Sequence, residues 1–239
     1  MAAKTLTSWS FSRYSDYVQC PYKAKLKHLD RIKEPGNEAM QRGADIGKKA
    51  ELYVKGEGRV LPPELLKFAP LFRELRKRYK KKMHGMTVED TWAFTNAWDQ
   101  TTWNDWVNCW VRIKLDVAYP EDDETLIVVD WKTGKFREEK NAEYMEQLEL
   151  YALGALLMHP HVKTVRPCLK YLDHGITYPP EGEEIEYTRA DIPKLQKTWA
   201  KRTKKMLSDT RFAPRPNNLC KWCHYRKDNA ANGGGQCKF

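Results

Sequence analysis

The sequence of 239 residues has no long apolar run. A helix needs ~18 consecutive apolar residues to cross a bilayer, and no stretch of the chain approaches that length. The first residues, MAAKTLTSWSFSRYSDY, also lack the apolar central segment of a secretory signal. We therefore expect a cytoplasmic protein that has no membrane partner.

The sequence also lacks internal repeats and any obvious linker. Hydrophobic residues make up 41% and aromatic residues 12% of the chain, which is enough for a packed core. The length suits one sizeable domain. We expect a single domain over residues 1–239, in which 1–85 form a helical part, 86–212 the core and 213–239 a cysteine-rich tail.

Acidic residues are in the minority, because 42 Lys and Arg residues face 32 Asp and Glu residues and the formal net charge is +10. This balance suits a polyanionic partner, with nucleic acid ahead of an acidic membrane. The charge is also compatible with a basic protein that has no polyanionic partner. Two expected helices are rich in cations that could contact DNA phosphates, and a solvated helix face is the alternative for them. The candidate DNA contacts are Arg73, Arg76, Lys77, Lys80, Lys201 and Lys204.

The spacing of apolar residues predicts both helices and strands. Helices are expected over 10–30 with a break at residues 20–21, and over 37–54, 62–83, 141–158 and 191–208. Strands are expected over 87–98, 103–119, 125–131 and 162–172, with 185–187 as a further candidate. This order predicts an α/β domain whose mixed central sheet is flanked by helices.

Two of the expected strands form a hairpin that carries charged side chains. Asp116 lies near the end of one strand and Asp130 near the end of the next, after the apolar run LIVV. Lys132 follows two residues later, so its side chain points to the same face of the sheet as that of Asp130. One interpretation is that all three are ordinary surface charges at strand ends. Burial of a carboxylate without a partner is costly, which favours a functional role.

The chemistry of such a trio is specific. Two neighbouring carboxylates repel each other unless a cation lies between them, and a hard divalent ion with oxygen ligands meets that need. A lysine beside the ion can orient or deprotonate a water, or stabilise the negative charge that develops on a phosphate. Asp116, Asp130 and Lys132 therefore predict metal-assisted hydrolysis of a phosphodiester.

Four motifs follow one another along most of the chain. The opening segment reads S-x-S-x-x-x-x-Y-x-x-C-P, and Asp116 stands where a G-x-x-D strand carries its aspartate. Residues 130–135 read D-x-K-T-G-K, and Gln147 with Tyr151 forms Q-x-x-x-Y. Together they resemble the RecB-type branch of the PD-(D/E)XK nuclease superfamily, in particular the iron–sulfur-containing members similar to CRISPR-adaptation and phage exonucleases.

The resemblance implies a restriction-endonuclease-like core and a deoxyribonuclease that uses Mg²⁺ or Mn²⁺. It implies an exonuclease ahead of an endonuclease, acting on single-stranded DNA or duplex ends in recombination, repair or phage DNA metabolism. The setting would be a bacterial or phage-infected cell, with recombination or repair proteins as candidate partners. A non-catalytic DNA-binding or adaptor protein that retains the fold, and a basic zinc-ribbon RNA binder, are the other hypotheses.

The resemblance also implies roles for single residues. Asp116, Asp130 and the backbone carbonyl of Trp131 would bind the metal, and Lys132 would act on the attacking water. Gln147 and Tyr151 would help to place the DNA strand or the lysine.

The sequence departs from the family pattern at one position. The family motif reads G-x-x-x-H-x-x-x-E, and its histidine is a metal ligand. The corresponding segment RGADIGKKAE has Gly47 in place of that histidine, while Glu51 remains and is expected to bind the metal directly or through water. An alternative interpretation of Gly47 is that a small residue permits close helix packing there.

The six cysteines are expected to be reduced in the cytoplasm. Cys220 and Cys223 form the motif CKWC, and Cys237 follows in the tail. Cys20 precedes Pro21 in the opening motif, and the resemblance implies that these four thiolates bind a [4Fe–4S] cluster. Zn²⁺, with His224 as a substitute ligand, and the absence of a metal are the alternatives. A metal here would tie the two ends of the chain together.

Overall fold

The computed structural model describes residues 4–239 of the chain. Six strands form a continuous sheet in the order β2-β1-β3-β4-β5-β6, and β7 pairs with β5 beside this path. The pair β4–β5 is parallel and all other pairs are antiparallel. The strands are β1 (Thr87–Phe94), β2 (Gln100–Thr101), β3 (Val111–Pro120), β4 (Thr125–Lys132), β5 (Thr164–Tyr171), β6 (Ile176–Tyr178) and β7 (Tyr187–Thr188).

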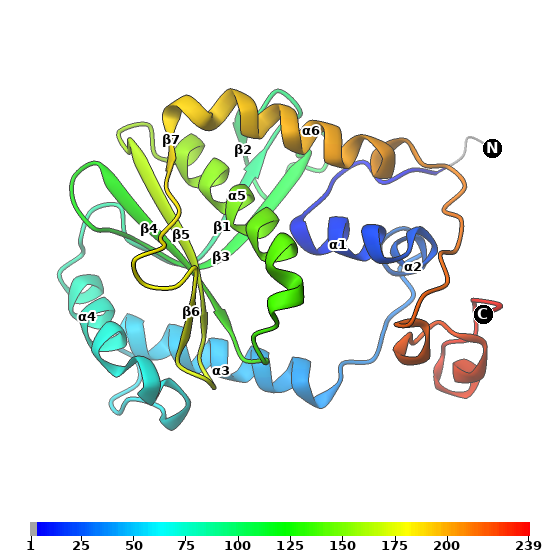
Figure 1. Cartoon of the computed structure of the whole chain (residues 1–239), viewed down its shortest axis with the longest axis horizontal. Helices are drawn as coiled ribbons and strands as arrows, with labels where there is room; N and C mark the ends of the chain where they lie inside the picture. The colour runs from blue at the N-terminus through cyan, green and yellow to red at the C-terminus, as the bar shows by residue number, and fades with distance from the viewer. Residues whose placement is uncertain (1–3) are drawn as a thin grey trace.

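Helices cover both faces of the sheet (Figure 1). On one face, α1 (Phe11–Gln19), α5 (Asn141–Met158) and α6 (Ile192–Ser208) bury one apolar cluster. On the other, α3 (Glu38–Lys55) and α4 (Ala69–Lys80) bury a second. The predicted α/β domain with a mixed sheet flanked by helices is confirmed. Within residues 4–239, none of the helices is long and apolar enough to cross a membrane.

The helix ends follow their sequences. Ser10 caps α1 and Asn37 caps α3, each accepting a hydrogen bond from a backbone amide in the first turn. The helix α3 ends at Gly56, whose φ of 87° lies in the left-handed region that suits glycine. The predicted break in the first helix is confirmed, because Cys20 is extended and Pro21 begins the short helix α2 (Pro21–Ala24).

Three predicted boundaries are wrong. The helix expected over 62–83 begins with a 3₁₀ segment, Pro63–Phe68, before α4 starts. The strand expected over 87–98 ends at Phe94, because the Thr95 hydroxyl accepts from two amides and forms a turn. The strand expected over 103–119 starts only at Val111, because the Asp105 carboxylate accepts from two amides in the preceding loop. The apolar tryptophans of these loops gave a strand-like pattern without strand pairing.

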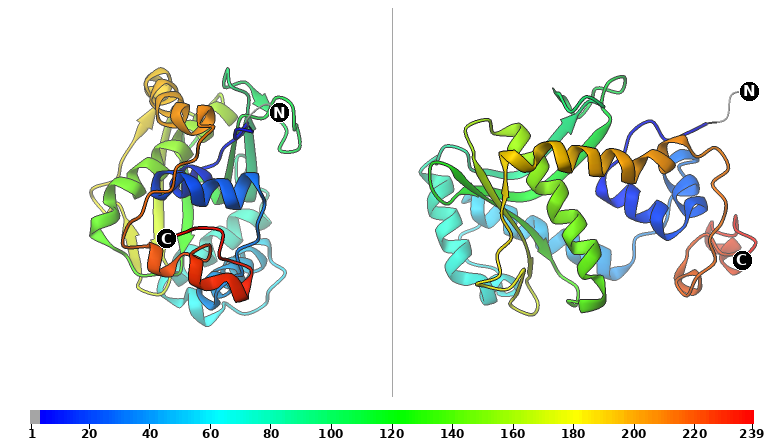
Figure 2. Two further views of the ribbon diagram at one scale, coloured as in Figure 1. Left: turned by 90° about the vertical axis from the view of Figure 1, so that its right-hand side faces the viewer. Right: turned by 45° about the horizontal axis from the view of Figure 1, so that its top comes forward.

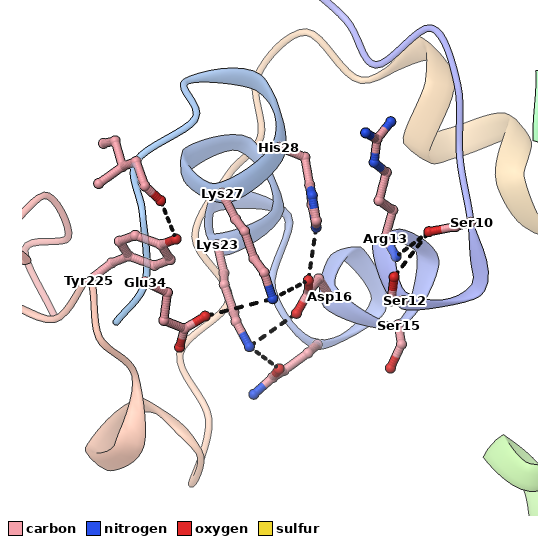
Figure 3. A network of polar contacts seen from close by, with 12 residues as sticks. Ser10, Ser12, Arg13, Ser15, Asp16, Lys23, Lys27, His28, Glu34 and Tyr225 are labelled. Atoms are coloured by element: carbon pink, nitrogen blue, oxygen red, sulfur yellow. Dashed lines mark hydrogen bonds and ion pairs between the residues drawn. The ribbon is translucent and has the colours of Figure 1, made fainter. Parts of the chain in front are cut away.

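A buried polar network ties α1 to the next two turns (Figure 3). The Asp16 carboxylate lies 2.8 Å from His28 Nε2, 3.1 Å from Lys23 Nζ and 3.0 Å from Lys27 Nζ. Lys27 and His28 lie in a π-helical turn, Lys25–Leu29, which directs both toward Asp16. Burial alone would raise the pKa of Asp16, but the hydrogen bond from His28 and the two lysines hold it well below its ordinary value.

Replacement of Asp16 by asparagine is expected to lower the free energy of unfolding by about 2 kcal/mol, because it removes a buried carboxylate and leaves half-buried cations without their counter-charge. Urea unfolding followed by circular dichroism measures this change. The matched control is Asp30→Asn, which breaks the more exposed pair with Lys25 and is expected to cost less than about 1 kcal/mol. Equal losses in the two variants would contradict the structural role of the Asp16 network.

Candidate active site

A cavity of about 830 Å³ lies between α3, the carboxyl end of β4 and the beginning of α5. Its floor holds Asp116, Trp131 and Lys132 from the central strands. Residues 43–51 of α3 line one side, and the segment from Thr133 to Lys140, with the first turns of α5, lines the other. The cavity thus opens where the sequence predicts the metal site.

The pairing of the strands brings the predicted trio together. The pairing of β3 with β4 ends at Val117 and Val129, and Asp116 and Asp130 are the next residues on the two strands. The Trp131 amide donates to Asp116 Oδ2 over 2.5 Å, and Lys132 Nζ lies 2.5 Å from Asp130 Oδ2. Both carboxylates therefore have one oxygen held by a neighbouring group of β4.

Gln147 and Tyr151 lie one turn apart on α5 and both contact Asp130. The Tyr151 hydroxyl donates to Asp130 Oδ1 over 2.6 Å. The Gln147 amide donates to the Tyr151 oxygen over 2.9 Å and to Asp130 Oδ1 over 3.5 Å. In this structure the pair fixes the orientation of a carboxylate, and the role in placing a DNA strand or the lysine stays a prediction.

The two carboxylates interact strongly in the absence of a cation. Burial, and next the charge of Asp130, raise the pKa of Asp116 to about 8. Burial would lower the pKa of Lys132, but the charge of Asp130 raises it above its ordinary value, so the lysine is charged. A divalent cation fits this set, because Mg²⁺ binds through one or two carboxylates and completes its shell with water and phosphate oxygens. Within residues 4–239, no three His, Cys, Asp or Glu side chains stand close enough to hold a metal by themselves.

Mn²⁺ binding is expected to release about one proton at pH 7, because a proton occupies Asp116 below its pKa of about 8 and must leave when the carboxylate binds a cation. The affinity should rise about tenfold per pH unit between pH 6 and 7 and level off above pH 8. Calorimetry in buffers of different ionisation enthalpy measures the proton release. An affinity that is constant from pH 6 to 8 would contradict this expectation.

The two α3 residues of the family motif line the same cavity. Glu51 pairs with Lys48 over 2.8 Å and with Lys55 over 2.7 Å, and hydrogen bonds from these lysines lower its pKa. No atom lies within 4 Å of the place where a Cβ at Gly47 would stand. The interpretation that Gly47 permits close helix packing is therefore wrong, since the space beside it is open.

The predicted DNA contacts lie outside the cavity. On α4, Arg76 donates to the carbonyls of Tyr53 and Gly58 at the end of α3, so its guanidinium is engaged within the protein. The helix α6, which carries the predicted contacts Lys201 and Lys204, packs beside α5 on the other face of the sheet from α3 (Figure 1). Besides Lys132, the cations that line the cavity are Lys48, Lys114, Lys135, Arg137 and Lys140.

Sequence reasoning gave none of these five a role. Three of them follow the D-x-K motif within a few residues, in the string TGKFREEK. The segment between β4 and α5 begins at the end of β4 that carries the predicted site. Ligand sites in α/β proteins lie at the carboxyl ends of strands, so the cations of this segment could have been predicted to line the cavity. Lys114 precedes Asp116 by two residues on β3 and shares its face, which is also readable from alternation.

The four cysteines of the predicted metal site line one small pocket between the α1–α2 junction and the C-terminal tail. Figure 2 shows this tail folded next to the N-terminal helices. The Arg215 amide donates to Cys20 Sγ, and the Asn217 amide to Cys220 Sγ, each over 3.3 Å. His224, the candidate substitute ligand, does not line this pocket.

The comparison with known families agrees with the site. The sequence profile of the PD-(D/E)XK nuclease superfamily matches residues 8–227. The chain belongs to the PD-(D/E)XK nuclease superfamily. The matched range includes the trio Asp116, Asp130 and Lys132 and ends before Cys237.

Two solved structures of other proteins are similar to the structure of this PD-(D/E)XK chain. The crystal structure of a protein described as "Putative exonuclease" from Eubacterium rectale is 11% identical, with a TM-score of 0.51. The match covers 92% of this chain and 88% of that one. The structure of SSO0001 is 14% identical with a TM-score of 0.37 and covers 94% and 86%. The first match shows a shared fold, and no curated protein matches the sequence.

Proposed function

We propose that this protein is a DNA exonuclease that depends on Mg²⁺ or Mn²⁺, acting in the cytoplasm of a bacterial or phage-infected cell. The observation that carries the proposal is the trio Asp116, Asp130 and Lys132: Asp116 and Lys132 line a cavity that cations surround, and Asp130 pairs with Lys132. A bound divalent ion would polarise the phosphate and make a water nucleophilic near neutral pH. Its protein ligands would be the two carboxylates, the carbonyl of Trp131 and, directly or through water, Glu51, which lines the same cavity.

The residues of the chain contribute orientation and charge. Tyr151 and Gln147 hold one oxygen of Asp130 and Lys132 pairs with the other, while the Trp131 amide holds one oxygen of Asp116. A cation would therefore bind the second oxygen of Asp116 and share Asp130 Oδ2 with Lys132. Lys132 stays charged and lies beside Asp130, where it can orient the attacking water and stabilise the charge that develops on the phosphate.

The DNA strand would approach along the cations of the cavity. Lys135, Arg137 and Lys140 come from the segment between β4 and α5, and Lys48 comes from α3. The end of α4 continues the basic surface, because Lys80 and Lys55 line a common hollow next to α3. Arg73 and Lys77 on α4, and Lys201 and Lys204 on α6, remain predicted contacts for longer DNA. Phosphate contacts of this kind bind without regard to sequence.

The test of the function compares substrates that differ only in their ends. Purified protein with Mg²⁺ or Mn²⁺ is incubated with circular single-stranded DNA and with the same DNA after linearisation, labelled at either end. An exonuclease degrades only the linear form and releases short products from one end. Equal cleavage of the circle would overturn the exonuclease mode. Binding without cleavage of either form would favour a non-catalytic DNA-binding protein.

We further propose that Cys20, Cys220, Cys223 and Cys237 bind a [4Fe–4S] cluster that joins the chain ends. Their common pocket and the amides that donate to two of the sulfurs support the proposal, because such hydrogen bonds stabilise thiolate ligands. Iron and sulfide analysis of protein purified without oxygen tests it, together with absorption near ~400 nm. Colourless protein that contains only zinc would overturn the cluster.

A further inference from the structure

The loop between β2 and β3 presents two neighbouring apolar side chains to solvent. Trp106 is 77% exposed and Val107 is 90% exposed. Single exposed apolar residues are ordinary on a protein surface, whereas a tryptophan next to a second apolar side chain is typical of a binding surface. Neither side chain lines the active-site cavity, so the proposed chemistry does not explain their exposure.

Asp105 holds this loop in one conformation. Its carboxylate accepts from the amides of Val107 and Asn108, over 3.1 and 2.9 Å. It also accepts from the Thr101 hydroxyl over 2.7 Å, which ties the loop to β2. The loop is therefore ordered before a ligand arrives, which lowers the entropic cost of binding at Trp106.

A fixed cation lies against the Trp106 ring. The guanidinium carbon of Arg112 is 5.0 Å from the centroid of this ring and 5.8 Å from that of Trp103. Arg112 donates to the Trp103 carbonyl over 3.0 Å and to Ser8 Oγ over 2.9 Å, and it is buried. The guanidinium thus holds the Trp106 ring from the protein side, and the exposed remainder of the ring is free to stack on a ligand.

Strand β3 connects this ring to the active site. Ile113 and Leu115 pack into the apolar cluster beneath α5. The alternating residues Arg112 and Lys114 therefore lie on the other face of the sheet. They are about 7 Å apart along the strand, and Lys114 lines the active-site cavity. A DNA strand that left the cavity along this face would meet Lys114 first and Trp106 next.

Lys114 can contact a phosphate on this path. Its Nζ pairs with the Glu89 carboxylate over 2.8 Å, but the lysine side chain is 61% exposed. An exposed pair of this kind contributes little to stability, so a phosphate can replace the carboxylate at small cost. A cation for the backbone next to an aromatic ring for a base is the arrangement by which proteins bind single-stranded nucleic acid.

We propose that Trp106 stacks on an unpaired base of a DNA strand whose end lies in the active site, while Lys114 contacts the phosphate backbone between them. The bases of a duplex are already stacked inside the double helix, so the ring selects single-stranded DNA. The cations beside the ring favour DNA over a protein partner or a second copy of the chain. This inference rests on the proposed nuclease function and adds the form of DNA that the site prefers.

The experiment measures DNA binding by the full-length protein in Ca²⁺, using fluorescence anisotropy with an oligothymidine of about 12 nucleotides and with a blunt duplex of the same length. Trp106→Ala is expected to weaken binding of the single strand about 10-fold, because it removes one stack between a base and an aromatic ring. Binding of the duplex is expected to change by less than about twofold. Trp106→Phe keeps an aromatic ring and is expected to bind the single strand within about threefold of the unaltered protein.

The matched control is Trp222→Ala. Trp222 is also 77% exposed, and Lys221 Nζ lies 5.5 Å from its ring centroid, but it lies in the tail and not on the path along β3. This variant removes an equally exposed ring beside a cation and is expected to leave binding of the single strand unchanged.

A second measurement identifies the stack itself. Oligothymidines that each lack one base, at successive positions, are bound to the unaltered protein and to Trp106→Ala. At one position, loss of the base is expected to weaken binding to the unaltered protein about 10-fold. The same loss is expected to leave binding to Trp106→Ala unchanged, because the stacking partner is already absent.

Equal binding of the single strand by Trp106→Ala and by the unaltered protein would overturn the inference, and weaker self-association of that variant in ultracentrifugation would assign the loop to a second copy of the chain. An equal loss of single-strand and duplex binding would overturn it as well. If the unaltered protein bound neither form of DNA, the proposed function would fail together with this inference. The expected loss of binding without any cleavage in Mn²⁺ would support the stacking site and overturn the catalytic function alone.

Discussion

Lys132→Ala is expected to reduce the rate of DNA cleavage about 1,000-fold while DNA binding changes by less than about threefold. The lysine lies on the cavity floor, paired with Asp130, and the charge of that carboxylate keeps it protonated. Its charge is therefore in place before the substrate arrives and acts where negative charge develops. Single-turnover cleavage of linear DNA in Mn²⁺ measures the rate, and fluorescence anisotropy in Ca²⁺ measures binding.

Lys163→Ala is the control for this prediction. Lys163 is an exposed lysine near the start of β5, at the opposite end of the sheet from Lys132, and it pairs with Glu124. Its removal also lowers the net charge by one but is expected to leave the cleavage rate unchanged. If Lys132→Ala cleaved DNA as fast as the unaltered protein, the assignment of the active site would be wrong.

Cys20→Ser is expected to abolish iron binding and to lower the Tm by more than about 5 °C. Cys20 is the only one of the four cysteines that comes from the N-terminal part of the chain, and its pocket lies between that part and the tail. Loss of the metal would leave the tail with few apolar contacts, since the described tail beyond residue 213 contributes one large side chain, Tyr225, to the fully buried set. A metal that binds only the folded state contributes its binding energy to stability.

The comparison variant is Cys168→Ala. Cys168 lies on β5 outside the four-cysteine pocket, and burial raises its pKa to about 11, so it is a poor metal ligand. This variant is expected to retain its full iron content. Retention of iron by Cys20→Ser would contradict the four-cysteine site, and iron loss from both variants would point to general misfolding.

Much of the active site could be predicted because it depends on short-range patterns. Alternation along β4 predicts that Asp130 and Lys132 share a face, whereas Gln147 and Tyr151 on the next helix were expected from the resemblance to the family motif Q-x-x-x-Y. The mixed sheet flanked by helices also followed from the element order. Asp116 required only the correct pairing of one hairpin, which its acidic turn indicated.

The other features of the site depend on backbone conformations and on tertiary contacts, and hydrophobic periodicity indicates neither. The left-handed backbone of Glu89 occurs at a residue type that does not favour it, so no local signal indicated its position beside Asp116. The cations of α4 were assigned to DNA by their density, whereas Arg76 instead caps the end of α3. The charge of a segment gives its attraction for phosphate, and tertiary packing decides which of its side chains are free.

The separation in sequence between residues in contact sets the order in which parts of the protein are expected to fold. The contacts of Asp130 with α5 span few residues, whereas Cys20 and the last cysteine, Cys237, are joined across nearly the whole chain. Contacts between distant segments form late, because a long loop must close first. A newly synthesised chain would thus complete its catalytic centre before the cysteine pocket exists. Insertion of the proposed cluster would then follow the folding of the catalytic centre.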